Sequence, residues 1–173
     1  MFGATHKKSD PHTLSDRQTR IYEFLQSMPV GVLSTVGLGQ KPHGSVIYFT
    51  IDENFKLSFL TKRDTRKYEN LQYNPAVTIT VFEPKTQATA QIMGEAVEVK
   101  DTTEMNRIAA VVLDVSLRTS QSGLPPISKL EAGPYVAFHV KPEQIRLAVY
   151  SRPDAGTQAD LFESLESFEL NPY

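Results

Sequence analysis

The densest group of chemically useful side chains follows a short apolar run at residues 57–60. Two hydroxyl residues, Thr61 and Thr65, lie there beside four cations that fall within six residues: Lys62, Arg63, Arg66 and Lys67. A helical pattern starts at the same place, and a helix start disfavours cations because the helix dipole is already positive there. Cations, hydroxyls and the free N–H groups of a first helical turn together suit a phosphate group. The cluster therefore predicts a phosphate-binding site, with a solvated basic loop as the alternative.

The other residues capable of chemistry form no comparable group. The four histidines, at positions 6, 12, 43 and 139, have no metal-ligand spacing. The absence of cysteine excludes disulfides, thiolate metal sites and cysteine nucleophiles. The glycines at 37 and 39 predict a hairpin turn rather than a nucleotide-binding loop, because no third glycine opens a helix after them.

Length and charge limit the classes of protein to consider. A chain of 173 residues fits one domain with a proper core. A net charge of -2 argues against a general affinity for nucleic acid or anionic membranes. No apolar run reaches the length of a membrane span, and residues 1–13 are too polar for a secretory signal. We expect a cytoplasmic protein with neither a nucleic acid nor a membrane as partner.

The apolar periodicity predicts the elements that must position the cluster. A capping box at residues 15–18 opens a helix that ends at Met28, and further helices are predicted over 65–73 and 102–117. Alternating or apolar runs predict strands over 30–36, 43–51, 55–60, 76–82, 88–99, 135–140 and 144–150. Gly94 indicates a bulge or bend within its strand.

This pattern is typical of an α+β protein, mainly antiparallel, built on a small closed barrel of about six to seven strands with flanking helices. Residues 1–13 are predicted to form a flexible tail and 14–150 the domain. The segment 118–133 has the length of a lid or binding loop. Residues 151–173 are predicted to form a linker and an amphipathic helix over 158–169, packed on the domain or on a partner subunit.

The cluster also carries a resemblance to a known family. Thr61, residues 65–67 (Thr-Arg-Lys) and, after an asparagine-leucine helix, residues 74–78 (Asn-Pro-Ala-Val-Thr) resemble the flavin mononucleotide (FMN) phosphate motif of the pyridoxamine 5'-phosphate oxidase-like split-barrel family. The preceding strands at 30–35 and 42–46 and the later strand at 91–97 are similar to that family in their order. The resemblance extends over roughly residues 20–100, and beyond them it rests on the order of elements alone.

The resemblance implies a Greek-key split barrel that binds FMN between the two subunits of a homodimer. It assigns the phosphate to Thr61, Thr65, Arg66 and Lys67. It places four residues along the isoalloxazine ring and ribityl chain: His43, Gly44, Ser45 and Val46. Thr89 falls where many relatives have a flavin-contacting glutamine, and Gln91 is the alternative residue for that contact.

The departures from the family limit the function. The true oxidases carry an arginine–histidine pair for pyridoxal phosphate near the C-terminus, and residues 145–153 contain no histidine. We therefore do not expect vitamin B6 oxidation. An FMN-dependent oxidoreductase acting on an unidentified small substrate is the first hypothesis. A non-catalytic flavin-binding stress protein, a deazaflavin (F420) protein, and a haem-binding or haem-degrading protein with His139 as candidate ligand are the alternatives. We expect the dimer contact on apolar residues near the C-terminus, namely Val149, Leu161, Phe162, Leu165 and Phe168.

Overall fold

The computed structural model describes residues 14–120, 134–149 and 162–166, the last segment by its backbone alone. The predicted tail, most of the 118–133 segment and the predicted linker lie outside these residues. Three helices are described: α1 (Asp16–Ser27), α2 (Arg66–Tyr73) and α3 (Thr102–Thr119). The described strands are β1 (Val30–Val36), β2 (Pro42–Ile51), β3 (Leu57–Lys62), β4 (Ala76–Glu83), β5 (Ala88–Glu98), β6 (Tyr135–Val149) and β7 (Phe162–Glu166).

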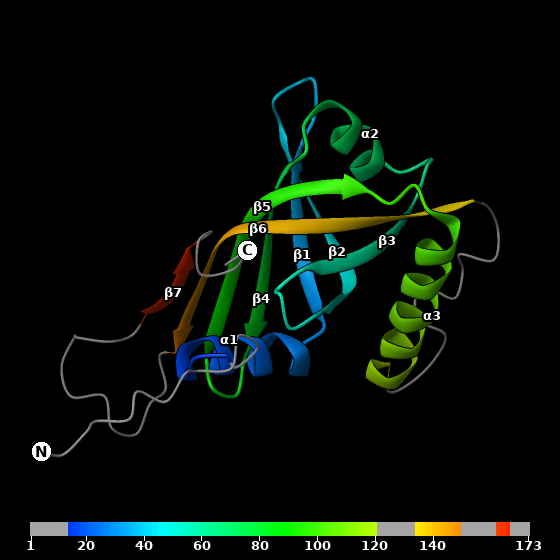
Figure 1. Ribbon diagram of the computed structural model, residues 1–173. Coiled ribbons are helices and arrows are strands. Elements are labelled where there is room, and N and C mark those ends of the chain that lie inside the picture. Colours follow the sequence, from blue (N-terminus) through cyan, green and yellow to red (C-terminus); the bar gives the residue numbers. More distant parts are fainter. Residues whose placement is uncertain (1–13, 121–133, 150–161, 167–173) are drawn as a thin grey trace, which may run out of the picture.

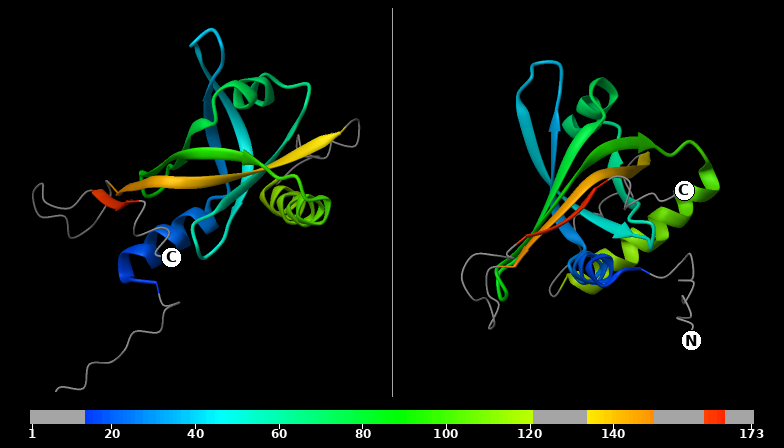
Figure 2. Two further views of the ribbon diagram at one scale, coloured as in Figure 1. Left: turned by 45° about the horizontal axis from the view of Figure 1, so that its top comes forward. Right: turned by 60° about the vertical axis from the view of Figure 1, so that its left-hand side comes forward.

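Within the described residues, these strands form one antiparallel sheet in the order β3-β2-β1-β4-β5-β6-β7. An additional pairing of β3 with β6, from Leu57 opposite Val140 to Lys62 opposite Tyr135, closes β1 to β6 into a barrel. The α+β class and the antiparallel barrel are therefore confirmed. The β1–β2 hairpin and α2 lie together at one end of the barrel, and α1 lies at the other end (Figures 1 and 2).

The barrel is open between β2 and β3. These strands pair only from Phe49–Phe59 to Ile51–Leu57. Beyond Phe49 the remaining part of β2 pairs with β1 alone among the described strands, whereas β3 stays paired with β6 as far as Lys62. The 42–48 part of β2 and the end of β3 therefore form the two walls of a split.

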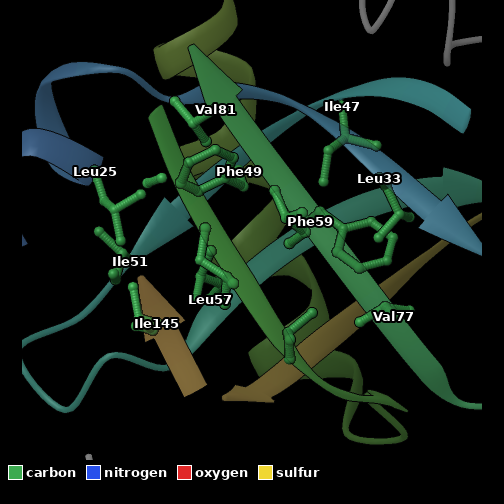
Figure 3. Packing of buried hydrophobic residues seen from close by; sticks show 14 of the residues in the cluster. Leu25, Leu33, Ile47, Phe49, Ile51, Leu57, Phe59, Val77, Val81 and Ile145 are labelled. Carbon is green, nitrogen blue, oxygen red and sulfur yellow. The ribbon is translucent and has the colours of Figure 1, made fainter. Parts of the chain in front are cut away.

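The core inside the barrel fixes these walls. Side chains from β1, β2, β3 and β4 meet inside it, as Figure 3 shows for Leu33, Phe49 and Phe59. Phe59 stacks on Phe138 of β6 with ring centroids 5.4 Å apart and planes inclined by 11°. Both rings are almost fully buried, and each such side chain contributes about 1.5–3 kcal/mol to folding.

The helix ends follow local chemistry. Ser15 and Gln18 form the predicted capping box, since the Ser15 hydroxyl accepts from Gln18 N and the Gln18 side chain accepts from Ser15 N. Thr65 is the N-cap of α2, and Asp101 is the N-cap of α3. The N-cap of α2 matters most here because it sets the position of the cationic cluster.

Two predicted elements differ from the structure. The strands predicted over 135–140 and 144–150 are one strand, β6. Pro142 lies opposite Gly94 next to a register shift, which is where a strand tolerates a residue without an N–H group. The helix predicted over 158–169 is wrong for residues 162–166, which form β7 against β6. The second half of β6 otherwise presents an open edge, and strand pairing there overrides a short helical pattern. The apolar helical face expected at the dimer contact is therefore not formed at these residues.

Candidate functional site

The 61–67 turn joins β3 to α2 and is ordered by its hydroxyls. Thr65 Oγ1 donates to Lys62 O at 2.8 Å and accepts from Tyr68 N at 3.4 Å. The hydroxyl of Thr61 lies 2.9 Å from that of Thr65, and Thr61 is almost fully buried. Because these hydroxyls hold the turn itself, the donors left at the helix start are the N–H groups of Arg66 and Lys67. The described residues supply neither of these N–H groups with a partner.

The same two residues carry the cations that lack a counter-ion. Neither Arg66 nor Lys67 forms an ion pair with any other described residue, and Arg66 is exposed. Lys67 is half-buried, and burial lowers the pKa of its ammonium group below the ordinary value. A desolvated cation at the positive end of a helix is unfavourable by itself, and an anion would relieve both effects.

The predicted cluster is not uniform, because Arg63 has partners. Its guanidinium donates to Glu98 Oε1 at 3.0 Å and to the Tyr68 hydroxyl, and its Cζ lies 5.3 Å from the centre of the Tyr68 ring. Lys100 also pairs with Glu98, at 3.1 Å. Burial raises the pKa of Glu98, but hydrogen bonds and the charges of Lys100 and Arg63 outweigh it, so the pKa lies below its ordinary value. Arg63 therefore holds the turn against β5 and is not available to a ligand.

The 43–46 segment forms the opposite wall of the split. Along β2, His43 and Ser45 alternate with the exposed Gly44 and Val46. His43 Nδ1 and Ser45 Oγ are buried and have no hydrogen-bond partner, and no other described residue has such a side-chain atom. Buried polar atoms are nearly always satisfied, so these two require a partner that the described residues do not supply. Both walls run away from the Phe49–Phe59 pair in the same direction, which brings this segment and the 61–67 turn together.

A buried hydrogen-bonded link between these two walls was missed by the sequence reasoning. Asn70 of α2 donates to Thr35 Oγ1 at 2.9 Å, and Thr35 Oγ1 donates to His43 O at 3.4 Å. The only sequence signal was a polar residue, Asn70, on the apolar face of a short helix.

Thr89 and Gln91 are not brought to the 61–67 turn within one chain. Gln91 pairs with Arg146 of β6, whereas Thr61 pairs with Val136 of the same strand. At roughly 3.3 Å per residue these positions are about 30 Å apart along β6. Gln91 lies on the outer face of the sheet, as the exposed Gln91 and Met93 and the buried Ala90 and Ile92 indicate.

His139 has partners on both ring nitrogens. Its Nδ1 lies 2.9 Å from Ser58 Oγ, and its Nε2 lies 3.4 Å from Glu104 Oε1. Its pKa is lowered, first by burial and then by Lys56, against opposite effects of Glu104 and Asp52. The side chain therefore joins β3 and β6 to α3, and nothing in this geometry points to a haem ligand.

The family model for pyridoxamine 5'-phosphate oxidase matches residues 18–148. The chain belongs to the pyridoxamine 5'-phosphate oxidase family. This confirms the resemblance read from the 61–67 turn, and the match includes both walls of the split. No curated protein matches the sequence significantly. No helix of the described residues is both long and apolar enough to cross a membrane.

Solved structures share the fold. The chain is similar to a heme binding protein from Mycobacterium smegmatis with a TM-score of 0.68 and 14% identity, covering 91% of this chain and 61% of that one. General stress protein 26 from Bacillus anthracis str. Sterne matches with a TM-score of 0.58 and 24% identity, covering 78% and 95%. An F420 reductase matches with a TM-score of 0.55 and 27% identity, covering 72% and 94%. The chain thus spans less than two thirds of the mycobacterial protein, and these likenesses establish the split-barrel fold.

Proposed function

We propose that this protein binds FMN in the split between β2 and β3 and is an FMN-dependent oxidoreductase acting on a small molecule. The phosphate is bound by Arg66, Lys67 and their N–H groups. The hydroxyls of Thr61 and Thr65 shape that turn, and residues 43–46 line the ring and the ribityl chain.

One observation carries this proposal: the two walls of the split lack complementary partners. One wall presents two cations without a described counter-ion, and the other presents two buried polar atoms without a described partner, His43 Nδ1 and Ser45 Oγ. A ligand with a phosphate at one end and a polar, aromatic ring at the other complements both walls at once. A solvated basic loop would explain the cations but not the buried atoms on β2.

When bound, a flavin supplies the electron-transfer chemistry, so the protein needs only to bind and orient it. This agrees with the lack of an evident acid–base pair in the sequence. The residues of this chain would bind the phosphate, form hydrogen bonds to the ring from the 43–46 segment, and shield the ring from water between the two walls.

We further propose that two copies of the chain associate through the outer face of the barrel. Val46 is 67% exposed and lies opposite Val32, which is 42% exposed, while Met93 and Val97 are exposed farther along the same sheet. Large apolar side chains exposed on one face of a sheet are costly in water unless a partner covers them. A flavin shared by two copies is also the arrangement in which Gln91 could face a ligand held by the 61–67 turn.

The experiment is to purify the protein, extract any cofactor and titrate the apo-protein with FMN and with F420. FMN bound in preference to F420, followed by oxidation of reduced nicotinamide, supports the proposal. FMN bound with no turnover under any electron donor supports a flavin carrier instead. Failure to bind FMN refutes the proposed site.

A further inference from the structure

We propose that Asn70 and Thr35 are positioning residues that fix the spacing between the two walls of the flavin site. The inference rests on the proposed FMN site and concerns residues outside the predicted ligand contacts. Asn70 belongs to α2, which carries the 61–67 turn at its start, and Thr35 belongs to β1, which pairs with the 43–46 segment.

A continuous hydrogen-bonded chain joins the walls. The Asn70 amide donates to Thr35 Oγ1 at 2.9 Å, and that hydroxyl donates to the carbonyl oxygen of His43 at 3.4 Å. Thr35 and His43 are also direct partners in the β1–β2 register. These hydrogen bonds thus connect α2 through β1 to His43 on β2, whose ring nitrogen Nδ1 has no partner among the described residues.

The link is buried and closely fitted. Thr35 is 1% exposed and Asn70 is 9% exposed. Because the Thr35 hydroxyl donates to His43, it must accept from the amide nitrogen, which directs Asn70 Oδ1 toward Gly37. A Cβ atom on Gly37 would lie 2.2 Å from Asn70 Oδ1, so the hairpin leaves no room for a side chain there.

The position of the link explains why it is needed. Past Phe49 and Phe59, no strand pairing joins β2 to β3 in the described part of the chain. Beyond this pair the separation of the two walls therefore needs a substitute for the missing ladder. The buried link from α2 to β1 and β2 supplies that substitute.

This role has a specific thermodynamic signature. A ligand that spans two subsites binds more tightly than its separate parts because contact with one subsite raises its effective concentration at the other. That gain depends on the distance between the subsites. Loosening the link should weaken the binding of FMN, which contacts both walls. It should leave the binding of riboflavin and of inorganic phosphate unchanged, because each of these contacts only one wall.

The test compares Thr35→Val, which keeps the shape and removes the hydroxyl, with Thr35→Ser, which keeps the hydroxyl. The probes are FMN, riboflavin and inorganic phosphate, measured by fluorescence and by competition. We expect Thr35→Val to lower the affinity for FMN by about tenfold, while the affinities for riboflavin and phosphate change by less than about twofold. Thr35→Ser should bind FMN nearly as the wild type does.

Wild-type FMN affinity in Thr35→Val overturns the inference, and so does an equal loss for FMN and riboflavin, which would indicate a purely local effect on the ring side. If Thr35→Val fails to fold, Asn70→Ala is measured against the same three probes with the same expected pattern. A wild-type protein that binds no FMN overturns the proposed function itself, an outcome distinct from the other two.

Discussion

Replacing Arg66 and Lys67 together with alanine is the most direct perturbation of the proposed phosphate site. The structure singles out this pair because Arg63, in the same cluster, is held by Glu98 and Tyr68. The pair has no ion-pair partner among the described residues, so its removal breaks no ion pair within the described parts of the fold. The double variant should therefore lose FMN binding and keep its structure.

The magnitude follows from the contacts that would be lost. A hydrogen bond to a charged group contributes about 1.5–3 kcal/mol, so losing two costs about 3–6 kcal/mol of binding free energy. This corresponds to a dissociation constant higher by roughly a hundredfold to ten-thousandfold. In the apo-protein the sign is opposite, since each first-turn cation opposes the helix dipole by about 0.3–1 kcal/mol. Burial of the Lys67 ammonium, which lowers its pKa, adds to that cost.

The assay is a flavin fluorescence titration beside thermal melts with and without FMN. Ligand binding to the native state should raise the Tm of the wild type and not that of the double variant. The apo-variant should melt at the wild-type temperature or slightly above it. The matched control is the double variant Lys85→Ala with Lys141→Ala. Both lysines are exposed and lie outside the site, and their replacement removes the same net charge.

Wild-type FMN affinity in the double variant would refute the phosphate assignment. An equal loss of affinity in the Lys85–Lys141 control would refute it as well, because general electrostatic attraction would then account for binding. A large fall in apo-protein stability would show that the two cations have structural partners and would contradict the argument from the unpaired charges.

Three further predictions test other parts of the structure. Because the pKa of His139 is lowered in the folded state, this imidazole takes up a proton more readily in the unfolded chain as the pH falls below about 6.5. The free energy of unfolding of the wild type, measured in urea, should therefore fall between about pH 7.5 and 5.5, and that of His139→Gln should fall less. Matching pH profiles would contradict this. Gly94→Ala would place a Cβ atom 2.1 Å from Lys141 O and should lower stability by about 1–3 kcal/mol or more, measured as the urea midpoint, whereas an unchanged midpoint would show that the bulge relaxes. Val46→Glu should convert a dimer into a monomer in light scattering, and a wild-type monomer with FMN bound would count against the proposed interface.

The sequence predicted most of the local structure because that structure depends on neighbouring residues. The capping box at Ser15, the N-cap at Thr65 and the bulge at Gly94 each follow from one residue type at one backbone position. The helix start at Thr65 in turn placed Arg66 and Lys67 in the first turn, which identified the candidate phosphate site. These features required no knowledge of tertiary contacts.

The remaining features depend on residues that are distant in sequence. Arg63 pairs with Glu98, 35 positions away, and this contact removes one of the four predicted cations from the candidate site. Asn70 reaches Thr35 over the same separation, and its polar character on an apolar helix face was the only signal. The strand at 162–166 forms because β6 offers an open edge, which local periodicity does not report.

Charge pattern alone therefore identifies a cationic cluster, but tertiary pairing decides what each cation does. Glu98 is shared by Arg63 and Lys100, so that carboxylate stabilises the turn without approaching the helix start. The helix start keeps two unpaired cations, one of them desolvated, beside N–H groups that have no partner in the described residues. Among the described residues the fold neutralises Arg63 with its nearby carboxylate and leaves Arg66 and Lys67 without a counter-ion. We therefore propose that an anionic ligand balances the charge of these two residues.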